Sequence, residues 1–400
     1  MNRVYLDYNA TTPVEPRVLE AMLPYFSGEF GNASSIHTPG QQARRAVETA
    51  REQVAALIGA RPREIVFTSG GTESDNHAIF GTVSPSLASS ASSRALASPR
   101  HVITTSMEHE AVLNACQALE ARGVVVTYLP VDREGLVSPD AVRHAIRRET
   151  ALVTIMHANN ELGAVQPIAE IGRIAKERKI TLHTDAVQSA GKLPVDVNAL
   201  NVDLLSLSGH KLYAPKGVGA LYVRSGTRIH PLLYGGHHQR GFRPGTENVA
   251  AIVGLGAAAE IARQSLAEEA QRVAALRDQL ECGIVQRVPH IRLNAGNAPR
   301  TPNTTNIMFT GIEGEALVIA LDLQGLACSV GAACSSGAVE PSHVLTAIGL
   351  SQDEAKSSLR FSLGRHTTES EIDFALETIP PAVAQLRALS PTYSKALSSL

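Results

Sequence analysis

The feature that most constrains the fold is an alternation of short apolar runs with amphipathic segments between residues 64 and 223. Short runs rich in β-branched and apolar residues are typical of buried strands. They are EIVFTS (64–69), HVITTS (101–106), VVVTYL (124–129), ALVTIM (151–156), ITLHTD (180–185), DLLSLS (203–208) and GALYV (219–223). Several are separated by helical patterns, one of which covers residues 166–179. Its residues Ile168, Ile171 and Ile174 share one face. This alternation predicts an α/β fold with a mostly parallel central sheet and helices on both faces.

The length of the chain, 400 residues, predicts two domains, because a single hydrophobic core stops growing at about 250–300 residues. We assign residues 15–255, which contain the predicted sheet, to a large domain. Residues 1–14 together with 256–400 are predicted to form a smaller α+β domain, which includes long helical stretches. Residues 84–100 are dominated by Ser and Ala and are predicted to be a flexible surface insertion in the large domain.

The charge balance gives no sign of direct binding to nucleic acid or to an anionic membrane, since 36 Lys and Arg oppose 38 Asp and Glu. The N-terminus reaches Asp7 before an apolar segment forms, and the most apolar stretch, 317–334, is broken by Asp322 and glycines. Neither a signal peptide nor a membrane span is therefore predicted. The absence of C-x-x-C spacing argues against a metal site and favours a reduced, cytoplasmic protein. The four cysteines are Cys116, Cys282, Cys328 and Cys334.

Ligands of an open α/β sheet bind at the carboxyl ends of its strands, so polar residues that follow strands are candidate site residues. The run 64–69 leads into Gly70, Gly71 and Thr72, where a helical pattern begins. Free N–H groups at a helix N-terminus, with glycines that permit close approach, favour an anion such as phosphate. A tight turn with a capping threonine is the alternative.

Two further strand ends carry groups that can react. Asp185 ends the run 180–185, and Gln188 lies one helical turn later. A buried carboxylate needs a partner, although Asp185 is also a candidate N-cap. Lys211 follows the next strand and is flanked by His210. A lysine at the edge of a cleft has a lowered pKa and a nucleophilic amine, whereas a solvated surface lysine is the simpler alternative.

Pyridoxal 5′-phosphate (PLP) requires all three of these features. It forms a Schiff base with a lysine, keeps its ring nitrogen protonated beside a carboxylate and is held by its phosphate. Asp185, Lys211 and the glycine-rich turn therefore predict a PLP site. His109, which follows the run 101–106, is a candidate for the face of the cofactor ring, with a helix-start histidine as the alternative.

The segment SVGAACSSGA, residues 329–338, places Cys334 among small residues and glycines. A structural cysteine normally packs among larger apolar side chains. A thiol on a pliable segment is instead expected to be reached by a reactant, so Cys334 is a candidate nucleophile.

A set of motifs carries a resemblance to a known family. In chain order they are YLDYNATTP, TSGGTESDN, EHEAV, NNELGAVQPI, TDAVQSAGK, SGHKLYAPKGVGALYV, RGFRPGTEN, ACSSGAVEPSHVL and LRFSLGR. Together they resemble the cysteine desulfurases, which have the aspartate aminotransferase-like fold of fold type I PLP enzymes. The resemblance covers roughly residues 4–375.

The resemblance implies the reactive residues of the site. Lys211 matches the lysine that binds PLP as the internal aldimine, and Asp185 matches the partner of the pyridinium nitrogen. Gln188 matches the contact of the ring hydroxyl, and His109 matches the histidine that stacks on the ring. Cys334 matches the catalytic cysteine, so Cys334, Lys211 and His109 are the predicted catalytic residues.

The resemblance also implies residues that bind the cofactor phosphate and the substrate. The phosphate-side residues are Gly71, Thr72, Ser208 and His210. Thr246 matches a phosphate contact from a neighbouring subunit, which implies a homodimer. Asn160 matches a contact of both cofactor and substrate, and Arg360 matches the clamp of the substrate carboxylate. An Arg side chain suits a carboxylate because it can donate two parallel hydrogen bonds.

The implied reaction converts L-cysteine to L-alanine and transfers the sulfur to Cys334 as a persulfide. Lys211 takes the α-proton of the substrate, and Cys334 attacks the substrate sulfur as a thiolate. The sulfur then passes to an acceptor protein, such as an iron–sulfur scaffold or a carrier for thiolation. The alternatives are a selenocysteine lyase or a related PLP lyase or aminotransferase. From another class, the alternative is a catalytically silent PLP-binding scaffold for sulfur-transfer partners.

The segment before Cys334 departs from the family pattern. Family members with a longer loop usually read SSGSAC, whereas this chain reads SVGAAC, with Val330 and Ala332 in place of serines. Cys328 is an extra thiol that the pattern does not contain, and it is predicted to pack in a core.

Overall fold

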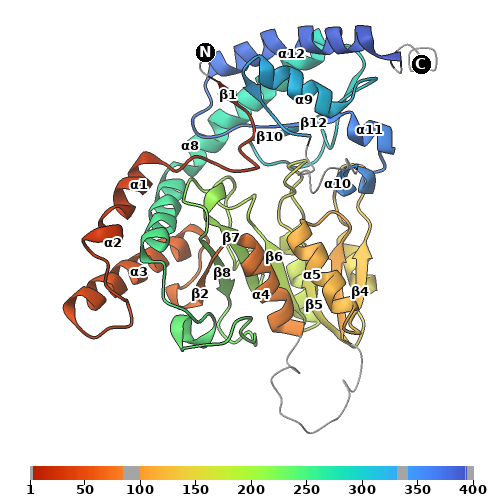
Figure 1. The fold of residues 1–400 in the computed structure, drawn as a ribbon. Coiled ribbons are helices and arrows are strands. Elements are labelled where there is room, and N and C mark those ends of the chain that lie inside the picture. Colours follow the sequence, from red (N-terminus) through yellow and green to blue (C-terminus); the bar gives the residue numbers. More distant parts are fainter. Residues whose placement is uncertain (1–2, 84–99, 331–340, 392, 394–400) are drawn as a thin grey trace.

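The computed structural model in Figure 1 describes residues 3–83, 100–330, 341–391 and 393. Cys334 lies outside the described residues, as does the predicted insertion apart from Arg100.

The central sheet has seven strands in the order β2-β8-β7-β6-β5-β3-β4. β8 is antiparallel to both of its neighbours, and the other adjacent pairs are parallel. The predicted strands and the mostly parallel sheet are confirmed. The strands are β2 (Ile65–Thr68), β3 (His101–Thr105), β4 (Val125–Leu129), β5 (Thr150–Thr154), β6 (Thr181–Asp185), β7 (Leu204–Ser208) and β8 (Gly219–Val223).

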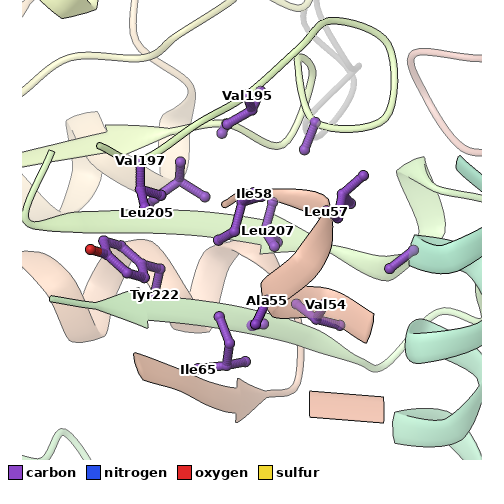
Figure 2. Close-up of a cluster of buried hydrophobic side chains, with 14 of the residues drawn as sticks. Val54, Ala55, Leu57, Ile58, Ile65, Val195, Val197, Leu205, Leu207 and Tyr222 are labelled. Atoms are coloured by element: carbon purple, nitrogen blue, oxygen red, sulfur yellow. The ribbon is translucent and has the colours of Figure 1, made fainter. Parts of the chain in front are cut away.

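Helices cover both faces of this sheet, as predicted (Figure 1). Alternate residues of a strand point to opposite faces, so Phe67 packs in one core and Val66 in another. Figure 2 shows part of the first core, where Tyr222 and Leu205 of the sheet lie close to Ile58. On this face lie α3 (Thr38–Leu57), α6 (Pro139–Ala145), α7 (Ile168–Glu177) and the first half of α8 (Val249–Arg287). On the other face lie α4 (Gly71–Val83) and α5 (Glu110–Glu120).

A second sheet has three antiparallel strands in the order β12-β10-β9. Its core contains Phe309 and Phe361, and it also takes in Leu6 from the N-terminal segment. Short β1 pairs in parallel with β11, which joins the N-terminus to this part of the chain. The elements are β1 (Val4–Tyr5), β9 (Ile291–Leu293), β10 (Thr304–Phe309), α9 (Gly314–Leu323), β11 (Leu326–Ala327), β12 (Ser358–Ser362) and α12 (Glu369–Leu389).

Short helices complete the described chain. They are α1 (Pro16–Met22), α2 (Pro24–Ser27), η1 (Pro62–Glu64), η3 (Gly209–Lys211), η4 (His238–Gly241), α10 (His343–Ala347) and α11 (Gln352–Lys356).

Helix α8 connects the two cores. Ala251 and Leu255 in its first half pack in the core of the large sheet, and Leu280 and Ile284 pack in the core of the second sheet. By length and composition α8 could also cross a membrane, and it is the one helix of the described residues that passes this test. Half of its apolar window is buried within the protein, as expected for a core helix. The division of the chain at residue 255 stays a prediction.

Cys328 packs in the core of the second sheet, which confirms the sequence prediction for this residue. Its thiol is buried, and this burial raises its pKa well above the usual range. The protonated thiol is a poor nucleophile, so Cys328 is structural.

We expect Gly219→Ala to destabilise the protein by ~1–3 kcal/mol through overpacking. A Cβ atom at Gly219 would lie 2.6 Å from the Leu207 carbonyl oxygen and 2.7 Å from the Gly70 Cα atom, and neither backbone atom can rotate away. Urea denaturation of the PLP-loaded protein measures the change. In the control, Gly28→Ala, the Cβ atom meets the Pro24 carbonyl oxygen at an ordinary 3.5 Å. A wild-type denaturation midpoint for Gly219→Ala would contradict this close approach of β8 to the turn before α4.

Candidate active site

A cavity of about 500 Å³ lies at the carboxyl ends of β6 and β7, beside the N-terminus of α4. β12 of the second sheet and the N-terminal segment complete its wall. Its volume lies within the range of small-molecule sites, roughly 300–1,000 Å³. The cavity brings together most of the predicted site residues, namely Gly71, Thr72, His109, Asn160, Asp185, Gln188, Ser208, His210, Lys211 and Arg360.

Two predicted site residues do not line this cavity in the described chain. Thr246 is exposed and lies away from it, so its predicted contact with a neighbouring subunit stays a prediction. Cys334 lies outside the described residues. Ser329 and His343, on either side of Cys334 in the chain, both line the cavity wall.

The turn before α4 forms a cradle for an anion. Helix α4 begins at Gly71, and the first N–H groups of a helix have no intrahelical acceptor. A Cβ atom at Gly71 would lie 2.9 Å from Val187 Cγ2, so a glycine leaves room between the turn and its neighbours. Glu73 fixes the turn, since it accepts hydrogen bonds from the Ser69 N–H at 2.8 Å and from Arg243 Nε at 2.9 Å.

His210 lies on the same side of the cavity. Its Nδ1 lies 3.1 Å from the Thr11 hydroxyl. Burial, reinforced by the positive charges of Lys211 and Lys216, lowers the pKa of His210 to about 4. The imidazole is therefore neutral near pH 7, and it can present a hydrogen-bonding group without a charge.

Asp185 ends β6 and faces the cavity. Its Oδ1 accepts a hydrogen bond from the Val187 N–H at 2.8 Å, so it also caps the following turn, as the alternative interpretation proposed. Burial raises the pKa of Asp185, against the effects of this hydrogen bond, His109 and Lys211. Burial also raises the pKa of Asp75, whose Oδ1 is buried without a hydrogen-bond partner in the described chain. Two carboxyl groups on one cavity wall suit a cationic ring nitrogen.

Lys211 follows β7 in η3, and its amine points to the N-terminal segment. Nζ donates hydrogen bonds to the carbonyl oxygens of Asn9 and of Ala10, the latter at 2.7 Å. Burial, followed by the positive charge of Arg360, lowers the pKa of Lys211 to about 8. A lysine with a pKa near neutrality has a substantial fraction of free amine, so it can act as a nucleophile and as a base. The simpler interpretation of Lys211 as a solvated surface residue is wrong.

His109 is both a helix-start residue and a cavity residue. It is the N-cap of α5, where its Nδ1 accepts a hydrogen bond from the Ala111 N–H at 3.1 Å. Because Nδ1 is an acceptor, the proton of the neutral ring is on Nε2. The ring is thus held in one orientation at the cavity.

Arg360 on β12 lines the cavity, and two hydrogen bonds hold its guanidinium there. Nη2 pairs with Asp7 Oδ1 at 2.7 Å, and Nη1 donates to the Asn160 carbonyl oxygen at 3.1 Å. Nε is buried and has no hydrogen-bond partner among the described residues. Each Nη has a second N–H group, so the guanidinium at this position fits a ligand carboxylate.

Two buried glutamates, Glu108 and Glu161, accept hydrogen bonds from Ser342 and His343 at the cavity wall. The Ser342 hydroxyl donates to Glu161 Oε2 at 2.6 Å, and His343 Nε2 donates to the Glu108 carbonyl oxygen at 2.8 Å. The carboxyl of Glu108 accepts from the Met156 N–H at 2.9 Å and from the Thr105 hydroxyl at 2.7 Å. Burial raises the pKa of Glu108 to about 8.

Local sequence patterns predicted no individual role for Asp7, Asn9 or Lys192, although these residues border the cavity residues. Asn9 Oδ1 accepts hydrogen bonds from Lys192 Nζ at 3.1 Å and from Asn303 Nδ2 at 3.0 Å. Asp7 and Asn9 lie two and four residues after the end of short β1, so the rule that pointed to Asp185 could have found them. A two-residue strand is too short for its pattern to be recognised.

Comparison with known proteins shows the family. The family model "Aminotransferase class-V" matches residues 4–374. The chain belongs to the class-V aminotransferase family. A cysteine desulfurase IscS from Dictyoglomus turgidum is 49% identical over 388 residues, which are 97% of this chain and 96% of that protein. Cysteine desulfurase 1 from Trichormus variabilis is 51% identical over 393 residues, 98% of this chain and 95% of that protein.

Solved structures of similar proteins have the same fold. A NifS-like protein superposes with a TM-score of 0.87 at 38% identity, covering 96% of this chain and 100% of that one. The structure of SspA in complex with cysteine has a TM-score of 0.79 at 42% identity, covering 91% of this chain and 99% of that one. Within the family, the chain is thus a PLP-dependent cysteine desulfurase, and the predicted fold, enzyme class and cofactor are confirmed. The amine of Lys211, the carboxyl of Asp185 and the cradle at Gly71 fit that cofactor.

We expect Glu108→Gln to stabilise the PLP-free protein relative to wild type, increasingly as the pH rises from about 4.5 to about 8. In this interval the folded state of the wild type binds more protons than the unfolded state, because the pKa of Glu108 rises from 4.5 to about 8 on folding. The free energy of unfolding of the wild type therefore falls with pH, while glutamine does not titrate.

Urea denaturation at pH 5 and at pH 8 measures this difference, which we expect to change by on the order of a few kcal/mol. Glu52→Gln, at an exposed position on α3, is the control and should show no such change. A pH-independent difference for Glu108→Gln would contradict the raised pKa of Glu108.

Proposed function

We propose that this enzyme converts free L-cysteine to L-alanine and passes the sulfur, as a persulfide on Cys334, to an acceptor protein. One observation carries the proposal. Lys211, Asp185 and Arg360 line one cavity together with Ser329 and His343, the described residues before and after Cys334 that reach its wall. The names of the relatives, cysteine desulfurases, support the substrate.

Individual residues have proposed roles in holding PLP. Lys211 would bind the cofactor through its amine, Asp185 would face the ring nitrogen and Gln188 the ring hydroxyl. His109 would cover the ring. The residues proposed for the phosphate are Gly71, Thr72, Ser208 and His210, which line the cavity near the N-terminus of α4. When bound, PLP supplies an electron sink for the substrate carbons.

Lys211 also has a proposed role in proton transfer. Its Nζ is held by the backbone carbonyl groups of Asn9 and Ala10, so it stays at the cavity when a substrate amine displaces it. With a pKa of about 8, Nζ can accept the α-proton of the substrate near neutral pH and can return a proton to the product.

Arg360 and Asn160 are proposed to hold the substrate carboxylate. Asp7 fixes the guanidinium by binding Nη2, and the second N–H groups of Nη1 and Nη2 are the proposed donors to the substrate carboxylate. This fixes the amino acid by its carboxylate and leaves its side chain free to meet Cys334.

Cys334 is the proposed nucleophile. Its thiolate sulfur forms a bond to the sulfur of the bound cysteine, and the bond between that sulfur and the substrate carbon breaks. The electron pair of the broken bond stays with the substrate fragment, which takes up a proton on the way to alanine.

We also propose a cytoplasmic homodimer that donates sulfur to an iron–sulfur scaffold or another sulfur carrier. Exposed large apolar side chains near the N-terminus support an interface, since clustered apolar surface marks contact sites. They are Leu19, Leu23, Phe26, Phe30 and Ile36. Exposed Thr246 would reach the cofactor phosphate of the other subunit. The IscS name of several relatives supports an acceptor in iron–sulfur assembly.

We expect a mass spectrum of the PLP-loaded enzyme, taken after L-cysteine without reductant, to show one added sulfur atom on the Cys334 peptide. Lys211→Ala should form no alanine, and Cys334→Ala should carry no persulfide. Alanine formation without sulfur on Cys334 would contradict its role as the nucleophile. Full activity of Lys211→Ala would contradict the role of the lysine.

We expect Arg360→Lys to raise KM for L-cysteine on the order of tenfold or more, because a hydrogen bond to a charged group contributes about 1.5–3 kcal/mol. Steady-state kinetics of alanine formation measure the change. Arg292→Lys is the matched control, because Arg292 lies on β9 of the same sheet and forms an exposed pair with Glu354. An unchanged KM for Arg360→Lys would place the carboxylate elsewhere.

A further inference from the structure

Lys192 is a half-buried lysine whose ammonium contacts two residues of the cavity wall. Its Nζ donates to Gln188 Oε1 at 2.7 Å and to Asn9 Oδ1 at 3.1 Å. Gln188 Nε2 donates in turn to the Asn9 carbonyl oxygen at 3.0 Å. That same carbonyl oxygen accepts a hydrogen bond from Lys211 Nζ. Lys192, Gln188 and Asn9 thus form a closed ring of hydrogen bonds behind Lys211.

This ring fixes which way the Gln188 amide faces. The Asn9 carbonyl oxygen can only accept and a charged Lys192 can only donate, so the NH₂ group of Gln188 faces Asn9 and its amide oxygen faces Lys192. The second N–H of that NH₂ group is free for the cavity that Gln188 lines. A neutral lysine still has two N–H groups, so it can donate to both oxygens in either protonation state. Without Lys192, the amide oxygen of Gln188 would lose its donor, and only the hydrogen bond to the Asn9 carbonyl oxygen would hold the amide.

An ion pair does not explain the position of Lys192. The charged groups that act on it are Lys211, Arg360 and Glu269, of which only Glu269 is negative. No salt bridge to Lys192 is found in the part of the chain that the structure describes. Burial and the two positive neighbours lower the pKa of Lys192 to about 7. Burial costs this lysine part of its hydration. The groups that replace water are Asn9 and Gln188, which both line the cavity.

We propose that Lys192 is a positioning residue that holds the Gln188 amide with its NH₂ group toward the bound PLP. This rests on the proposed function, in which Gln188 contacts the ring hydroxyl of the cofactor. A donor at that oxygen favours its anionic form, and a hydrogen bond from Lys192 to the amide oxygen polarises the amide and strengthens the donor.

The test follows the visible absorption of PLP-loaded protein as a function of pH, without substrate. Lys192→Met removes the donor and keeps most of the side-chain volume. We expect the midpoint of the pH-dependent change to rise by on the order of one pH unit, because the anionic oxygen loses stabilisation. Lys176→Met, at an exposed position on α7, is the matched control and should keep the wild-type midpoint. Lys192→Gln, whose shorter side chain cannot replace both hydrogen bonds, is measured alongside in case Lys192→Met does not fold.

A double-mutant cycle with Gln188→Met separates this inference from the proposed function. If Lys192 acts through Gln188, Lys192→Met changes the midpoint in the wild type and leaves it unchanged in a Gln188→Met background. The absorption midpoint could instead shift in Gln188→Met and stay at the wild-type pH in both Lys192→Met and Lys192→Gln. This result would overturn the positioning role of Lys192 and leave the contact of Gln188 with the cofactor intact. No change in Gln188→Met would overturn both, because Gln188 would then make no contact with the cofactor ring.

Discussion

The backbone and side chain of Asn9 hold the two cores of the protein together at the cavity. The Asn9 N–H donates to the Ser362 hydroxyl, and its side-chain amide donates to the Thr304 hydroxyl at 2.8 Å, so it is bound to the second sheet. Its carbonyl oxygen accepts from Lys211 in η3, which follows β7 of the large sheet. The cavity exists because the N-terminal segment crosses from one core to the other at this point.

Burial at this junction shifts the pKa of acids and bases in opposite directions. Burial disfavours every charged form, so the pKa of Lys211 falls to about 8 while that of Glu108 rises to about 8. These opposite shifts bring the pKa values of an amine and a carboxyl group to about the same value, close to neutral pH. One physical effect therefore prepares both groups for proton transfer.

Much of the fold could be predicted from the sequence, and so could part of the site. Strand and helix periodicity is local, so the runs that became β2 to β8 were recognisable, as were Asp185 and Lys211 at strand ends. The roles of Asn9 and Lys192 depend on contacts between residues nearly two hundred positions apart, such as the hydrogen bond between Lys192 and Asn9. No local pattern reports such contacts. The buried state of Glu108 was equally hidden, because a glutamate beside a helix start is usually exposed.

The sequence by itself determined the order of strands and helices, the glycine-rich turn and the set of reactive side chains, because each depends on neighbouring residues. The tertiary structure decided which of these side chains meet. It brought Arg360 of the second sheet to Lys211 of the first, and it placed Ser329 and His343 on the same cavity wall. It also decided their protonation, since the pKa of a group depends on how far folding removes it from water.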